Sequence, residues 1–454
     1  MELMFDDILV ILLVLLGILT ALILFKNAYD RKKAGRYKAA TSFSMLALAF
    51  ISLAVAHLNE LSLVEIPYHF FIAFMGLFIL FLFIFVSIGL NLEKYTIYIV
   101  VIYVLSIGGL MSTPFPVAYA IIYTLMDIVG IITILIFIYM YLRIHSFGPF
   151  GFSIGLAIFL FLASFIHTGV IPTSHEVALR FHLASFALIF AASIFGAEKS
   201  ILKGLANFIG IVLLIFGLAH SFYSIGLSMS IDYVLIFFGL GVSGLGLAVL
   251  VGTFVKKYQN TGDTISYTMA LGMMFLLLYH MLLIEYLTVI TFGEPPFILT
   301  LLIKFGYAKL LVITGIVILL YSLIRIYEKP MLNNLLVAYY TASIIYVAFF
   351  SDPSLGLIYY VAIFIIDAVT TMLPAFIFIY YGLRLLLSRI FGGGIPLSIG
   401  IGLLLYSLTN AAIMAFNNYL IAAILSLTLG IILILGNGGY LDKMLIRFLK
   451  KGGV

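Results

Sequence analysis

The sequence predicts an all-α fold, a polytopic integral membrane bundle of about 15 transmembrane helices, and three observations predict it. Of the 454 residues, 65% are hydrophobic and 9% are charged, whereas a soluble domain carries about a quarter charged residues. Apolar runs of about 20 residues, the length that spans a bilayer as a helix, recur from end to end. Charged residues gather between these runs, so no stretch is left for a soluble domain.

The first helix is expected at residues 7–26 and resembles a secretory signal only in being apolar. Acids precede it and bases follow it, which is the reverse of a signal peptide, so we expect it to be retained. The remaining apolar runs pair into seven helical hairpins, each with two arms and a short tip. They are expected at residues 40–92, 95–145, 150–198, 203–257, 264–328, 331–389 and 395–437.

The hairpins repeat one another. His57 and His69 stand twelve residues apart, and 163 residues later His220 and Asp232 stand twelve apart, each pair followed by a similar apolar run. A third copy carries His167, a loop three residues longer, and His182. Such self-similarity indicates duplication of a hairpin. The chain is accordingly divided into a first helix with three hairpins, a second half of three hairpins, and a last hairpin with a basic tail, at residues 1–200, 203–390 and 391–454.

The basic residues predict the orientation of the bundle. Of the 23 lysines and arginines, 20 lie after the first helix, between hairpins or in the tail, and loops rich in such residues stay in the cytoplasm. We therefore expect a multi-pass protein of the cell (plasma) membrane with its N-terminus outside and its C-terminus cytoplasmic. The N-terminus and the hairpin tips carry nine acids and one base, Arg180, so the outer face is expected to be acidic.

The histidines are the first candidates for chemistry. All but His145 fall near or in the hairpin tips, and imidazole in lipid is costly unless it is hydrogen-bonded or bound to a metal. Imidazoles facing each other across helices are axial ligands for haem b. One reading is therefore haem ligation, and the other is that these side chains hydrogen-bond to carbonyls and cap the hairpins. The candidate cofactor ligands are His57, His69, His167, His182, His220 and His280, and the first four of these are the strongest candidates for the haem iron.

Charged residues inside the predicted helices are the second set of candidates. Antiparallel packing of the fifth hairpin would place Glu285 opposite Lys304, and His280 opposite Lys309. Buried charges are costly singly, so ion pairing is the simplest explanation, and a proton path or an anion site is the functional alternative. Asp127 and Asp367 are the other acids within apolar helices, either protonated and hydrogen-bonded or acting as proton relays.

Several kinds of chemistry have no support in the sequence. The absence of cysteine excludes disulfides, a thiolate nucleophile and a Cys-ligated iron–sulfur cluster. Loops for nucleotide or phosphate binding, a His-Glu-x-x-His motif and a serine nucleophile motif are also absent, and we expect no nucleic-acid partner.

The placement of Ala56-His57 at the end of one hairpin arm and His69 at the start of the next, repeated with His167 and His182 and again with His220, resembles the hydrophobic membrane subunit of archaeal b-type cytochromes. That subunit pairs with an extracellular, glycosylated haem protein. The resemblance implies a respiratory electron-transfer subunit that binds haem b near the outer leaflet, oxidises quinol and passes electrons to an outer haem-containing partner. The alternatives are a secondary or proton-coupled transporter built from helical repeats, and a scaffold subunit without chemistry.

Overall fold

The computed structural model describes residues 5–61, 67–110, 113–162, 175–292, 308–326, 331–350, 371–388, 393–414, 418–437 and 439–451. Over these ranges the regular structure is helical throughout, without a β-strand. Ten of the helices are long and apolar enough to cross a membrane, and five shorter ones are also apolar. The predicted fold class, a multi-pass helical membrane bundle, is confirmed.

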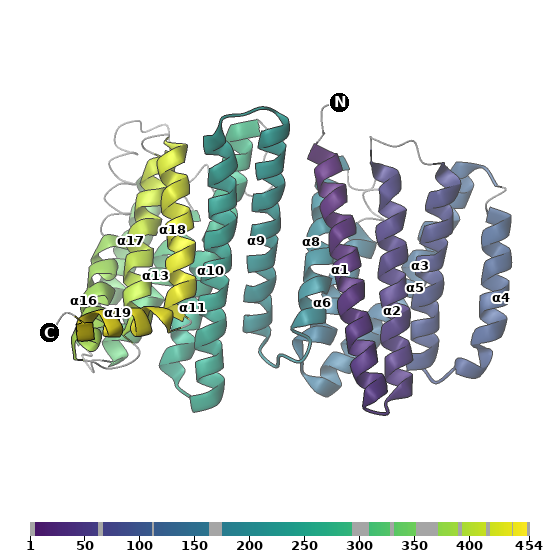
Figure 1. Ribbon diagram of the computed structural model, residues 1–454, viewed down its shortest axis with the longest axis horizontal. Coiled ribbons are helices and arrows are strands. Elements are labelled where there is room, and N and C mark those ends of the chain that lie inside the picture. Colours follow the sequence, from purple (N-terminus) through teal and green to yellow (C-terminus); the bar gives the residue numbers. More distant parts are fainter. Residues whose placement is uncertain are drawn as a thin grey trace. The chain divides into compact units, whose positions relative to one another are not determined.

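The chain forms two compact units, which we call the N-terminal unit (Met1–Gly204) and the C-terminal unit (Leu205–Val454) (Figure 1). Residues 391–454 belong to the same compact unit as residues 205–390. The N-terminal unit contains α1 (Phe5–Lys33), α2 (Tyr37–His57), the short helix η1 (Leu58–Glu60), α3 (Tyr68–Gly89), α4 (Glu93–Leu110), α5 (Phe115–Ile144), α6 (Phe147–Ala157), the π-helical turn η2 (Ile158–Leu162) and α8 (His175–Ile194). The C-terminal unit contains α9 (Ile201–Gly226, which begins just before the division), α10 (Ile231–Thr261), α11 (Thr264–Phe292), α13 (Ala308–Ile326), α14 (Met331–Phe350), α16 (Leu373–Leu387), α17 (Gly394–Met414), α18 (Tyr419–Asn437) and α19 (Tyr440–Lys451).

In the N-terminal unit, helix α1 packs on both α2 and α8. A small residue permits this approach: a Cβ atom on Gly17 would lie 2.7 Å from the Ala54 Cβ and 3.1 Å from the Phe186 ring. Phe50 of α2 is fully buried, and its ring meets that of Phe186 edge to face at 6.0 Å. This aromatic core continues towards the end of the unit where α2 finishes and α8 begins.

In the C-terminal unit, α10 packs on both α11 and α18, and α11 packs on α13. Glycines stand at each crossing, because helices in lipid associate through close van der Waals contact rather than through the hydrophobic effect. A Cβ atom on Gly246 of α10 would lie 3.0 Å from the Gly430 carbonyl of α18. At the α11–α13 crossing, a Cβ atom on Gly272 would lie 2.8 Å from the Gly315 carbonyl.

Two aspartates cap helices in the C-terminal unit. Asp263 precedes α11 and accepts hydrogen bonds from the Ile265 amide at 3.0 Å and the Ser266 hydroxyl at 2.7 Å, as expected of an N-cap residue. Asp442 of α19 is buried and accepts a hydrogen bond at 2.8 Å from the amide of Gly394, the first residue of α17. A residue distant in sequence thus supplies a cap to α17.

Candidate functional site: a buried histidine pair

Two of the histidines predicted to bind a cofactor meet in the N-terminal unit. His57 is the last residue of α2 and His182 lies in the second turn of α8. Both side chains are buried, with 4% and 3% of their surface exposed, and their ring centres lie 5.3 Å apart at an interplanar angle of 61°. Residues separated by more than a hundred positions are therefore brought into contact at one end of the unit.

Aromatic side chains surround this pair. The Phe159 ring of η2 lies 4.9 Å from the His182 ring and 6.1 Å from the His57 ring. The Phe186 ring lies 6.1 Å from the His57 ring. Phe186 is one turn along α8 from His182, and the π-helical turn carries Phe159 to the pair. Aromatic rings therefore pack against both imidazoles.

The carboxylate is that of Glu60, whose Oε1 lies 2.9 Å from Nδ1 of His57. A carboxylate accepts hydrogen bonds, so Nδ1 of His57 is the donor in this contact, and in the neutral form of the imidazole the Nε2 atom keeps its lone pair. That Nε2 atom is buried, and no group in the described part of the chain is hydrogen-bonded to it. A carboxylate that orients a histidine and leaves the opposite nitrogen available is a recurring support for metal ligands.

The other predicted iron ligands are placed differently. His69 lies in the first turn of α3 with an exposed side chain, and its ring lies 3.8 Å from the ring of its neighbour Tyr68. His167 lies outside the described residues. Of the four strongest candidates, the structure therefore brings together His57 and His182.

The two candidate histidines of the C-terminal unit take part in hydrogen bonds. His220 of α9 lies 4.9 Å from the Phe237 ring and 5.7 Å from the Phe292 ring. Its Nδ1 donates to the Phe216 carbonyl at 2.7 Å, and its Nε2 lies 3.1 Å from the Thr288 hydroxyl. This arrangement matches the second reading of the histidines, in which they hydrogen-bond to neighbouring groups.

His280 of α11 is anchored to α10. Its Nε2 lies 2.8 Å from both the Leu240 carbonyl and the Ser243 hydroxyl. The Leu240 carbonyl also accepts the Ser243 hydroxyl proton at 3.0 Å, so Nε2 is the protonated nitrogen of His280. The α10–α11 contact therefore contains a polar link within an apolar interface.

The predicted intramembrane charges are partly described. Lys309 of α13 is buried, with its Nζ 5.8 Å from the centre of the Tyr279 ring, next in sequence to His280. Glu285 on α11 and Asp127 on α5 are half-buried. Lys304 and Asp367 lie outside the described residues.

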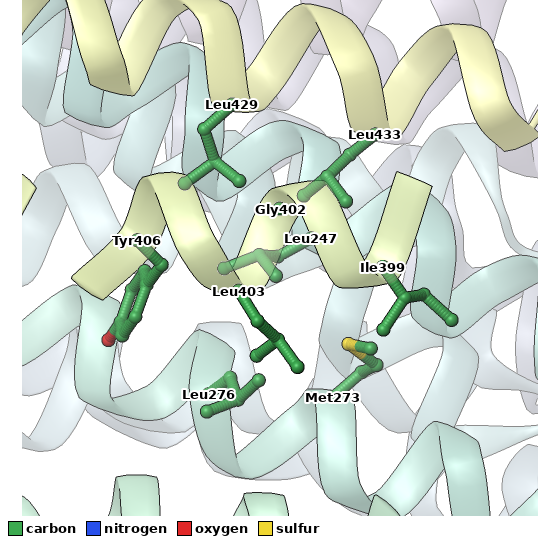
Figure 2. Close-up of a pocket in the computed structure, with 9 residues that line it drawn as sticks. All are labelled: Leu247, Met273, Leu276, Ile399, Gly402, Leu403, Tyr406, Leu429 and Leu433. Atoms are coloured by element: carbon green, nitrogen blue, oxygen red, sulfur yellow. The ribbon is translucent and has the colours of Figure 1, made fainter. Parts of the chain in front are cut away.

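No group of three or more metal-binding side chains occurs within the ranges that the structure describes. A small cavity of about 10 Å³ lies in the C-terminal unit, room for about one water molecule. Residues of α10, α11, α17 and α18 line this cavity (Figure 2): Leu247, Met273, Leu276, Ile399, Gly402, Leu403, Tyr406, Leu429 and Leu433. The lining is apolar apart from the Tyr406 hydroxyl, which points away from the other residues. The cavity is too small for an organic substrate.

Sequence reasoning found His57 and His182 but missed Glu60 as the partner of His57 and Phe159 as a wall of the site. The spacing of three between His57 and Glu60 is the signal that could have found the first, since such residues share one face of a helical turn. Comparisons with protein family models, curated proteins and solved structures gave no match to this chain.

Proposed function

We propose that the chain is the membrane subunit of a respiratory electron-transfer complex, binding haem b through His57 and His182. The observation that carries the proposal is the buried contact between these two imidazoles, together with the buried Nε2 atom of His57, to which no group in the described part of the chain is hydrogen-bonded. Haem, when bound, supplies a one-electron carrier. The residues supply two neutral nitrogen ligands and a setting from which water is excluded.

The donor set suits this group, because histidine nitrogens are common ligands of haem iron. The two imidazoles come from distant parts of the chain, and their ring centres lie 5.3 Å apart. The rings of Phe159 and Phe186 lie beside the pair and keep its surroundings apolar on that side. His57 and His182 are therefore the residues that would hold the haem.

Glu60 acts through His57 in this proposal. Its carboxylate holds the imidazole in the tautomer that keeps the Nε2 lone pair available, and it makes that nitrogen a stronger donor. Phe159 and Phe186 exclude water from the pair.

The finer features of the membrane arrangement belong to the same proposal. The proposal has fifteen spans in the cell (plasma) membrane, with the N-terminus outside. In this arrangement the end of α2 and the start of α8 lie at the outer leaflet. The distribution of basic residues in the sequence supports this orientation. Labelling that finds the segment containing Lys32 outside the cell would overturn this orientation.

A haem held by His57 and His182 near the outer leaflet would supply one-electron chemistry between a quinol dissolved in the bilayer and a protein docked outside. The acidic hairpin tips offer that protein a surface, which steers association and fades as the carboxylates are protonated. We therefore propose quinol as the electron donor and an extracellular haem-containing subunit as the acceptor.

The absorption spectrum of the purified protein, reduced and oxidised, tests the cofactor. We expect Soret and α bands in the wild type, and loss of these bands in His57→Ala and in His182→Ala. His145→Asn is the matched control, because His145 has a left-handed backbone (φ +50°) that asparagine also adopts, and it lies at the end of α5 away from the pair. A wild-type protein that carries no haem, or variants that keep all of it, would refute the proposal.

A proton-coupled or secondary transporter is the second candidate, favoured by Lys309. This lysine is buried beside Tyr279, near the middle of the 29-residue helix α11, and ionisable groups at such depth mark transport pathways. Uptake of a solute or of protons into vesicles, abolished in Lys309→Met, would support this candidate. A colourless protein with such activity would replace the first proposal.

A further inference from the structure

Helix α19 is held across the end of the C-terminal unit. It follows α18 after a turn at Gly439 (φ +65°) and packs on the ends of α16, α17 and α18 (Figure 1). Asp442 fastens it there, because its buried carboxylate accepts the Gly394 amide proton at 2.8 Å. The charge of Asp442 is therefore turned towards the positive end of the α17 dipole and away from the surface.

The opposite side of α19 is exposed and basic. Tyr440, Lys443, Met444 and Arg447 are all exposed, and their spacing of three and four places them on one face of the helix. Tyr440 and Met444 are 62% and 59% exposed. The exposed stripe therefore combines two positive charges with an aromatic ring and a flexible apolar side chain.

Further bases lie at the same end of this unit as α19. Thr253 of α10 is hydrogen-bonded to Asn437 at the end of α18, and the Arg325 guanidinium of α13 lies 3.5 Å from the Thr264 hydroxyl at the start of α11. The ends of these helices therefore lie at the same end of the C-terminal unit. The exposed bases here are Lys256, Lys257, Arg325, Arg384, Lys443 and Arg447.

The acids that the structure describes at this end offset only part of this charge, because Asp263 forms an ion pair with Lys257 and Asp442 is used as a helix cap. Asp442 is buried against α17, and Asp263 accepts hydrogen bonds from α11 and lies 3.9 Å from Lys257. The end of the unit is therefore strongly positive.

We infer that α19 and the bases around it form a docking surface for the anionic headgroups of phospholipids in the adjoining leaflet. Charge complementarity selects an anionic partner. The exposed Tyr440 and Met444 select a lipid surface over a soluble acidic protein, because aromatic and apolar side chains beside lysine and arginine are typical of the membrane interface. The position of α19 across the helix ends places the stripe where the spans leave the hydrocarbon.

Binding of short-chain lipids to the full-length protein in a neutral detergent tests this inference. The probes are dioctanoylphosphatidylglycerol, which is anionic, and dioctanoylphosphatidylcholine, which is zwitterionic. We compare the wild type with Lys443→Gln/Arg447→Gln and with the charge-conserving control Lys443→Arg/Arg447→Lys. Both pairs of substitutions lie on the exposed face, so the Asp442 contact is kept.

We expect the wild type to prefer the anionic lipid by at least about tenfold at low salt, since each base near an anionic headgroup contributes about fivefold in affinity. The glutamine variant should lose about tenfold or more of that affinity, while the control keeps it. Equal binding of the two lipids, or unchanged binding in the glutamine variant, would overturn the inference. Preference for a polyglutamate peptide over the anionic lipid would overturn it in favour of a soluble acidic partner.

Discussion

The crossing of α11 and α13 offers a sharp test of how the C-terminal unit is held together. Gly272 and Gly315 face each other there, so that a Cβ atom on Gly272 would lie 2.8 Å from the Gly315 carbonyl oxygen and 2.8 Å from the Leu319 Cγ atom. A Cβ atom on Gly315 would lie 2.7 Å from the Gly272 carbonyl oxygen. Each added methyl group therefore meets a backbone atom that cannot rotate away.

We expect Gly272→Ala to lower the free energy of unfolding by about 1 to 3 kcal/mol, the usual cost of overpacking a close contact. In a soluble helix, alanine would recover up to about 1 kcal/mol through its higher helix propensity. That gain is largely missing here, because transmembrane helices remain helical when they separate within the lipid. The cost should therefore lie in the upper part of the range.

Equilibrium unfolding in mixed detergent micelles, followed by loss of helix contacts, measures this change. The matched control is Gly108→Ala in α4, where a Cβ atom would have no neighbour within 4 Å. We expect the control to differ from the wild type by less than about 0.5 kcal/mol. Equal effects of the two substitutions would show that the Gly272 contact does not limit the approach of the helices, and the reasoning would be refuted.

Three further predictions concern single contacts. Replacement of Asp442 by alanine should lower the free energy of unfolding of the C-terminal unit by about 1.5 to 3 kcal/mol, the range for a buried hydrogen bond to a charged group, and asparagine should retain part of it; hydrogen exchange at the start of α17 reports this loss. Asp263→Ala should cost about 1 kcal/mol as an N-cap is removed. The hydrogen bond from the Ser266 hydroxyl is the main cause that holds the pKa of the Asp263 carboxyl below its ordinary value of 3.8. The stabilisation by Asp263 is therefore complete above pH 3.8, and it is lost as the pH falls through the lower pKa of the folded state. Unfolding measured at a series of pH values should show this loss in acid in the wild type and not in Asp263→Ala. Phe50→Ala should destabilise the N-terminal unit by about 3 to 5 kcal/mol, because the whole ring is buried and its removal leaves a cavity. An unchanged unfolding midpoint would contradict the packing described for α1, α2 and α8.

The helical membrane fold and the outer bounds of the hairpins could be predicted from the sequence alone, whereas the first helix, expected at residues 7–26, extends to Lys33 and includes bases expected to follow it. In lipid each backbone amide must be satisfied within its own segment, so an apolar run of sufficient length has little choice but to form a helix. The predicted hairpin at residues 40–92 accordingly appears as α2 and α3. The basic segments, which follow the ends of many helices, are also local features that the chain displays directly.

Which histidines meet was decided by tertiary structure. His57 and His69 share a hairpin and a repeat pattern, yet His57 contacts His182 of α8 while His69 is exposed. Contact between side chains depends on the rotation of each helix about its axis and on which helices are neighbours, and a twelve-residue spacing across a tip specifies neither.

The cap on α17 has the same origin. In sequence, Asp442 is one acid among the bases near the C-terminus, and no local signal links it to Gly394, 48 positions earlier. Only the packing of α19 against α17 brings the carboxylate to the unsatisfied amide at the helix start. A pattern in sequence reports what a segment must bury, whereas the choice of partner depends on the free energy of the whole packed unit.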